Sequence, residues 1–148
     1  MQIQIEIINN VTKEIVESKL TDLIRRGFGE WDPRWFYGKF NQHQDFLLLI
    51  ANLDGKPVGF KLGYPIDEMK YYSWLGSVVP EARRRGIAEA LMQAQHDWCK
   101  REGYKVIQTK SQNRLKKMII LNLKNGFDIV DMHDSDEGGV KIVMEKHI

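Results

Sequence analysis

Three consecutive arginines followed by a glycine, at positions 83–86, carry the clearest chemical signal in this chain. The mostly apolar residues 73–79 before them predict a strand, and the helical spacing of Ile87, Leu91 and Trp98 predicts a helix after them. The first N–H groups of a helix have no internal acceptor and lie at the positive end of its dipole. Because Gly86 has no Cβ, a phosphate can approach the backbone closely. Together with the arginine charges, this pattern predicts a diphosphate site.

The arginine run has two alternative interpretations. One is a solvated helix start, although basic side chains near a helix N-terminus oppose its dipole and a bound anion would offset that repulsion. The other is a nucleic-acid surface. The charge balance argues against the second, because 22 Lys and Arg against 20 Asp and Glu give a net charge of only +2. We therefore expect a small phosphate-bearing ligand and no nucleic acid.

Composition is that of an ordinary globular protein. The 148 residues predict one domain, 1–148, and 43% are hydrophobic and 28% charged. No apolar stretch approaches the roughly 20 residues that a membrane helix needs. Residues 1–7 alternate like a strand, unlike a targeting peptide, so a cytoplasmic protein is expected. Cys99 is the single cysteine and the four histidines are scattered, so neither a disulfide nor a metal site is expected.

Periodicity predicts strands and helices that place the arginine segment at the end of a strand. The expected strands cover 2–8, 45–51, 58–64, 71–79, 104–110, 127–132 and 140–144. The expected helices cover 12–27, a short stretch after Pro33, 84–102 and 115–125. The strand, helix and strand between 71 and 110 form a βαβ unit, whose two strands should be parallel.

The segment 78–88 resembles a known signature. Its pattern, Val-x-Pro-x-x-Arg-x-x-Gly-x-Ala, is similar to the acetyl-coenzyme A signature of the GNAT family of N-acetyltransferases. A second resemblance lies in residues 113–127, which end in Gly-Phe as a short helix does in many members. The resemblance covers the whole chain. It implies an α/β (α+β) fold with a mixed, mostly antiparallel sheet of about seven strands, one splayed parallel pair and about four flanking helices.

The resemblance also implies an activity, the transfer of an acetyl group from acetyl-CoA directly to a primary amine of a small molecule or peptide. The pantetheine arm of the cofactor would pair with the strand, and its diphosphate would bind the following loop. Asn113 and Met118 match the family's cofactor contacts less well. The asparagine that contacts the cofactor in many members falls two residues later, and Met118 fits core packing equally well. The expected cofactor-binding residues are Val78, Val79, Arg83, Arg84, Arg85, Gly86, Ile87, Ala88, Asn113 and Met118.

The chain departs from the family where proton transfer is concerned. Many members have a tyrosine four residues before the glycine of Gly-Phe, but this chain has Asn122, whose amide donates a hydrogen bond and cannot deliver a proton. Residues 73–79 contain no carboxylate, so Glu68, in the preceding connection, is the nearest candidate base. Asn122 and Glu68 are therefore the candidate catalytic residues. The simpler interpretation of Asn122 is a polar helix residue without a catalytic role, and that of Glu68 is a solvated surface acid.

Several alternatives stay open. The aromatic segment 28–40 is either a small satellite core or one wall of an acceptor pocket. Because the tyrosine and the strand carboxylate are missing, an acyl-CoA-binding module with little turnover is the alternative function. The amine acceptor cannot be read from the sequence. No membrane partner is expected, and a homodimer is one open option for the assembly.

Overall fold

The computed structural model describes residues 2–136 and 138–148, and its elements follow the expected order. The strands are β1 (Ile3–Ile8), β2 (Leu47–Leu53), β3 (Lys56–Pro65), β4 (Lys70–Val78), β5 (Val106–Gln112), β6 (Asp128–Asp134) and β7 (Val140–His147). The helices are α1 (Lys13–Ile15), α2 (Thr21–Phe28), α3 (Pro33–Phe40), α4 (Ile87–Arg101) and α5 (Lys116–Lys124). A π-helical turn (Val16–Leu20) joins α1 to α2, and a 3-10 turn (Pro80–Ala82) follows β4.

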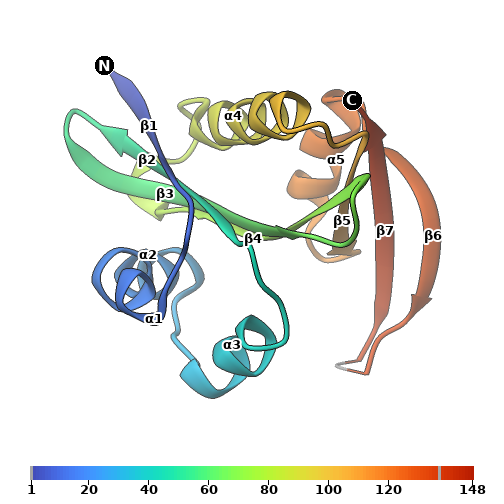
Figure 1. Cartoon of the computed structure of the whole chain (residues 1–148), viewed down its shortest axis with the longest axis horizontal. Helices are drawn as coiled ribbons and strands as arrows, with labels where there is room; N and C mark the ends of the chain where they lie inside the picture. Colours follow the sequence, from blue (N-terminus) through green and yellow to red (C-terminus); the bar gives the residue numbers. More distant parts are fainter. Residues whose placement is uncertain (1, 137) are drawn as a thin grey trace.

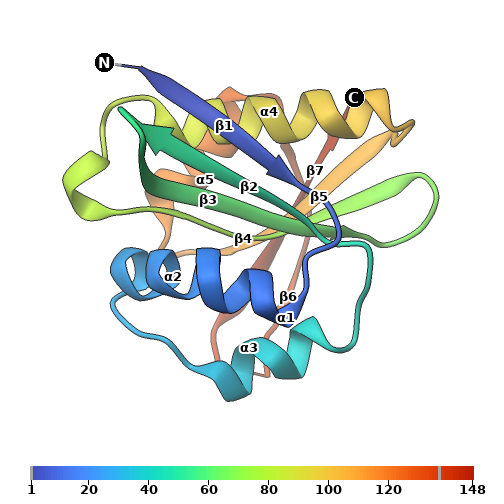
Figure 2. The ribbon, with the colours of Figure 1, turned by 60° about the vertical axis from the view of Figure 1, so that its left-hand side comes forward.

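The strands form one seven-stranded sheet in the order β1-β2-β3-β4-β5-β7-β6. Of the strand pairs described, β4 with β5 is parallel and the others are antiparallel, as expected. Helix α4 covers one face of the sheet, whereas α1, α2 and α3 lie on the other (Figure 1; a second view is given in Figure 2). This arrangement confirms the expected mixed sheet with flanking helices.

The first helix begins where expected and ends later. Thr12 Oγ1 accepts a hydrogen bond from the N–H of Ile15 (3.2 Å) and caps the helix. The expected end at Gly27 is wrong, because the helix continues until Gly29 closes it in the left-handed conformation (φ 83°). Gly27 is small for another reason: a Cβ there would lie 2.3 Å from Ser77 Oγ. The missing side chain lets α2 pack directly against β4.

The aromatic segment forms helix α3 and much of the core beneath it. Asp32 caps the helix by accepting a hydrogen bond from the N–H of Trp35 (3.2 Å). Phe36 is buried, and its ring centroid lies 5.2 Å from that of Trp74 in β4 and 5.4 Å from that of Phe40. These contacts place Phe36 and Phe40 in the main core, so packing accounts for part of this segment. Trp35 is 40% exposed, so one aromatic edge still faces solvent.

The parallel strands β4 and β5 stay paired over four residues only. Their pairing ends at Ser73 and Thr109, where Thr109 Oγ1 donates a hydrogen bond to the C=O of Ser73 (3.1 Å). Beyond this point β5 continues beside β7, and residues 74–78 of β4 have no neighbour on that side. We call this opening, between residues 74–78 of β4 and 110–112 of β5, the fork. It confirms the expected splayed pair.

A β-bulge explains why the fork opens where it does. Leu62 of β3 faces Leu75 of β4, but the next residue, Gly63, faces Ser73, so Trp74 is an extra residue without a partner in β3. A bulge bends its strand and increases the local twist. Because the bulge follows the last parallel pair directly, β4 turns away from β5 at this residue.

Candidate active site

The loop between β4 and α4 presents backbone donors without acceptors. Arg84 (φ 65°) and Gly86 (φ 77°) are both left-handed, so α4 begins at Ile87 and not at position 84 as expected. Its first internal hydrogen bond runs from the N–H of Ala90 to the C=O of Gly86 (3.0 Å). Within the described chain, the N–H groups of residues 84–89 have no acceptor. They lie at the positive end of a 15-residue helix, an arrangement that favours an anion.

The three arginines of this loop make different contacts. Arg83 donates from Nε to the C=O of Val78 (2.8 Å) and from Nη2 to the C=O of Gly27 (3.0 Å). Its guanidinium therefore ties the loop to β4 and α2, and its part in cofactor binding stays a prediction. Arg84 and Arg85 are exposed and have no hydrogen-bond or ion-pair partner among the described residues. Their side chains can reach an anion at the loop.

The β4 edge in the fork carries free backbone groups of alternate residues. The N–H of Val79 bonds the C=O of Val58 (2.8 Å), and the C=O of Val79 accepts from the N–H of Ala82 (3.0 Å). The structure therefore corrects the expectation that Val79 pairs with a ligand, because both groups are used within the fold. Backbone groups of successive strand residues point to opposite sides. Gly76 thus directs both its groups into the fork, and Val78 directs its N–H there, while the C=O of Val78 accepts from Arg83 Nε (2.8 Å).

Buried polar groups without protein partners gather on the face of the sheet covered by α4 and α5. Gln95 of α4 is 1% exposed and Ser111 of β5 is 2% exposed, and neither the Gln95 amide nor Ser111 Oγ has a hydrogen-bond partner among the described residues. Buried polar groups are normally paired, because leaving them unpaired costs free energy. With the loop donors and the open edge, these groups fit an elongated ligand that has phosphates at one end and amides along its length.

A buried histidine and a lysine continue this polar layer. His96 Nδ1 lies 3.2 Å from Lys146 Nζ, and the buried Nε2 has no partner among the described residues. Burial lowers the pKa of His96 to about 3, with further lowering by the charges of Lys146 and Lys61. The imidazole is therefore neutral at pH 7, and Nδ1 accepts a hydrogen bond from the Lys146 ammonium.

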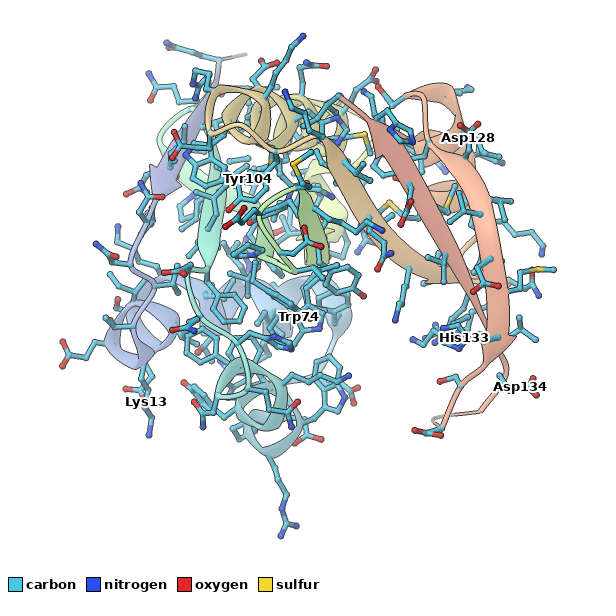
Figure 3. All side chains as sticks on the ribbon, turned by 45° about the vertical axis from the view of Figure 1, so that its right-hand side comes forward. Lys13, Trp74, Tyr104, Asp128, His133 and Asp134 are labelled. Atoms are coloured by element: carbon cyan, nitrogen blue, oxygen red, sulfur yellow. The ribbon has the colours of Figure 1, made fainter. Side chains whose placement is uncertain are left out.

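The opposite face of the fork is aromatic. Trp74 points from β4 toward α3, and its ring centroid lies 5.8 Å from that of the exposed Trp35 (Figure 3). Tyr72 is half-buried and lies two residues before Trp74 in β4. The Lys110 ammonium lies 5.9 Å from the centroid of the Tyr72 ring. The two faces thus differ in chemistry: polar groups lie below α4 and α5, and aromatic rings lie beside α3.

The structure buries Asn122 between α5 and β7. Asn122 is 4% exposed, and its Nδ2 donates a long hydrogen bond to Met144 Sδ (3.7 Å), between α5 and β7. This contact favours the interpretation of Asn122 as a polar helix residue in the interior. Met118, also on α5, is half-buried, and Asn113 is exposed just after β5.

Glu68 lies at the far end of β4. It is exposed in the turn between β3 and β4, where it lines a shallow hollow of about 440 Å³ with Asp67, His43 and Tyr104. Between this hollow and the fork lie the four closed pairs of β4 and β5. The structure therefore separates Glu68 from the loop and the open edge, and this argues against a role as the base.

Sequence patterns did not predict two residues that the structure places at the fork, Thr109 and Lys61. Thr109 closes its inner end through the bond to Ser73. Lys61 of β3 lies across Gly76, since a methyl group on the Gly76 Cα would be 3.4 Å from Lys61 Cγ. The sequence does carry a signal for Lys61, because it is the one charged residue within the otherwise buried segment 58–64.

Comparisons with known proteins agree with this geometry. Residues 17–127 match the acetyltransferase (GNAT) family, and the chain belongs to that family. Among curated protein sequences, none matches the chain significantly. No described helix is long and apolar enough to cross a membrane.

Three solved structures illustrate the shared fold. A GNAT family acetyltransferase from Elizabethkingia anophelis with acetyl-CoA bound has a TM-score of 0.79 at 16% identity, covering 97% of this chain and 98% of that chain. The ribosomal-protein-S18-alanine N-acetyltransferase from Escherichia coli has a TM-score of 0.78 at 17% identity, with 98% and 94% covered. The PaiA N-acetyltransferase from Thermoplasma acidophilum, in complex with coenzyme A, has a TM-score of 0.74 at 20% identity over 100% of both chains. At these identities the likeness concerns the fold.

Proposed function

We propose that this protein is an N-acetyltransferase that moves an acetyl group from acetyl-CoA directly to a primary amine of a small molecule or peptide. The observation that carries this proposal is the junction of two features: the unpaired β4 edge in the fork and the unsatisfied N–H groups of residues 84–89. Family membership and neighbours solved with acetyl-CoA or coenzyme A support the same cofactor.

In this proposal the chain's main task is to position the reactants. The N–H groups of residues 84–89, with Arg84 and Arg85, hold the diphosphate, while the backbone of Gly76 and the N–H of Val78 pair with the pantetheine arm. Acetyl-CoA supplies an acyl carbon activated as a thioester. A fixed arm converts acetyl transfer into an effectively intramolecular step, which can contribute roughly 7–11 kcal/mol in the best cases. Backbone N–H groups in the fork would polarise the carbonyl.

The amine would approach from the aromatic face, beside Trp74 and Trp35. The Lys110 ammonium, 5.9 Å from the Tyr72 ring centroid, supports this by placing a cation against an aromatic ring of the same face. Glu145, a carboxylate near this face, is ion-paired with Lys70 (2.7 Å), and that hydrogen bond lowers its pKa. A carboxylate with a lowered pKa is a weak base. The amine would therefore release its proton to solvent at the open edge of the face.

Amine-dependent release of the coenzyme A thiol from acetyl-CoA tests the proposal. The acceptor panel should include polyamines, amino acids and a peptide N-terminus, because one structural neighbour is named for an alanine of a ribosomal protein. We expect release that requires an amine, with a mass gain of one acetyl group on that amine. As a control, calorimetry measures the binding of acetyl-CoA independently of turnover. Binding of acetyl-CoA without turnover on any amine would instead identify an acyl-CoA-binding module, and absence of binding would overturn both functions.

A further inference from the structure

Lys61 is placed on the cofactor side of the sheet by the alternation of strand β3. Its neighbour Phe60 points toward α2, with its ring centroid 6.3 Å from that of Phe28. Successive strand residues point to opposite faces. The half-buried Lys61 side chain therefore lies on the face that α4 covers, the same face as the unpaired amide of Gln95.

The absence of a side chain at Gly76 lets the lysine reach the fork. Gly76 is the β4 residue directly opposite Lys61, and a methyl group on its Cα would lie 3.4 Å from Lys61 Cγ and 3.7 Å from Nζ. The lysine chain thus crosses the glycine, and its ammonium lies above the residue whose backbone faces the fork. Among the described residues, Nζ has no hydrogen-bond or ion-pair partner.

Helix α4 closes the space above this lysine. Leu91 Cδ1 lies 3.3 Å from the point where a Cβ on Gly59 would sit, and further along α4 Trp98 contacts Tyr71 at a centroid distance of 6.0 Å. Gln95 lies between Leu91 and Trp98 along the helix, and so at the level of Gly76. Two polar groups without protein partners, one from β3 and one from α4, therefore share the space beside the open edge.

We propose that Lys61 is the catalytic acid that protonates the departing thiolate, an inference that rests on the proposed function. The amine nitrogen forms a bond to the acyl carbon, and the carbon–sulfur bond breaks with its electron pair remaining on sulfur. Lys61 Nζ transfers a proton to that sulfur, giving the free coenzyme A thiol. The amine releases its own proton to solvent, and Lys61 regains one from solvent.

The position of Lys61 suits the leaving group and not the acceptor. An arm anchored at the loop must run along β4 toward the closed end of the fork at Ser73, and it passes Gly76 on the way. Lys61 lies on the polar face, whereas the amine approaches from the aromatic face beside Trp74. Asn122 has no proton to give and is directed to Met144, so it cannot fill this role.

The charge state of Lys61 agrees with this role. Burial lowers its pKa from the ordinary value to about 8, so it is mostly protonated at pH 7 and yields its proton more readily than an exposed lysine. The other titratable groups on this face are His96 and Cys99 of α4, Tyr71 of β4 and Lys146 of β7. Burial lowers the pKa of His96 to about 3, raises the pKa of Cys99 to about 12 and raises the pKa of Tyr71 well above its ordinary value. These three stay neutral near pH 8.

Substitution Lys61→Met tests the proposal, with Lys56→Met, exposed at the start of the same strand, as the matched control. An acid must be protonated to act, so wild-type turnover should fall as the pH rises through about 8. Lys61→Met should lower kcat about 100-fold, leave the KM for acetyl-CoA nearly unchanged and remove this falling limb. Lys61→Arg keeps the charge but cannot give up a proton, so it should be as slow as Lys61→Met. Turnover of Lys61→Met equal to that of Lys56→Met, or rescue by Lys61→Arg, would overturn the proposal.

A second measurement needs coenzyme A binding but no turnover. The thiol pKa of bound coenzyme A is read from the ultraviolet absorbance of the thiolate in wild type and in Lys61→Met. A cation close to the sulfur should make the wild-type value lower by about one unit or more. Equal values in the two proteins would overturn the assignment of Lys61 even if the protein acetylates amines. A shifted value in a protein that acetylates no amine would support Lys61 near the sulfur and contradict the proposed function alone.

Discussion

Replacing Gly86 with glutamate is expected to weaken acetyl-CoA binding at least about 100-fold while the fold is retained. Gly86 is left-handed (φ 77°), and a Cβ built on it meets no other atom within 4 Å, so a side chain there would occupy open space beside the loop of residues 84–89. A glutamate carboxylate there would compete for those N–H groups and repel the diphosphate. Placing like charges together costs several kcal/mol, and each 1.4 kcal/mol is tenfold in affinity. Calorimetry with acetyl-CoA measures the loss.

Gly103→Glu is the matched control for this substitution. Gly103 lies just after the other end of α4, is also left-handed (φ 91°) and also has open space around its Cβ position. It therefore shares the backbone strain and the added charge of Gly86→Glu but not the anion site. We expect similar losses of thermal stability in both variants and near-normal acetyl-CoA affinity in Gly103→Glu. Equal affinity in Gly86→Glu and wild type would remove the loop from the binding site.

Gly63→Ala should destabilise the protein by about 2–3 kcal/mol, a large effect for one methyl group. The new Cβ would lie 2.5 Å from the C=O oxygen of Tyr72 and 2.6 Å from Cε1 of Tyr71. Gly63 faces Ser73 at the bulge that opens the fork, so the strands cannot separate there without losing the fork geometry. Urea denaturation measures the free energy of unfolding.

Gly38→Ala provides the comparison for the same chemical change. Gly38 is exposed in helix α3, has no positive φ, and no atom lies within 4 Å of its Cβ position. Alanine is favoured over glycine inside a helix by about 0.5–1 kcal/mol, so this variant should be slightly more stable than wild type. If Gly63→Ala were as stable as Gly38→Ala, the close packing at the fork would be wrong.

Local patterns made much of the fold predictable. Thr12 caps the first helix, and Asp54 and Gly55 form a hairpin turn with two positive φ angles (50° and 84°). The apolar spacing in α4 and the glycine before it placed the loop with the three arginines between β4 and α4. Such features depend on residues close together in the chain, so the sequence alone reveals them.

Other features depend on contacts between distant segments. Nothing near Trp74 in the sequence marks the bulge, because it arises from the register of β4 against β3. The crossing of Lys61 over Gly76 depends on the same register. The direction of Asn122 follows from how α5 packs on β7, where Met144 meets its amide. Helix α4 begins at Ile87, later than the expected position 84, because Arg84 in the preceding loop is left-handed. Spacing alone does not predict this conformation of a non-glycine residue.

A titration of acetyl-CoA followed by backbone amide NMR tests the central claim most directly. If the cofactor lies along the open edge and its diphosphate binds the loop, the largest shift changes should fall on Gly76 and Val78 and on residues 84–89. Gly103, at the far end of α4, should change little. Changes concentrated instead around the hollow lined by His43, Glu68 and Tyr104, with the loop and the β4 edge unaffected, would contradict the account.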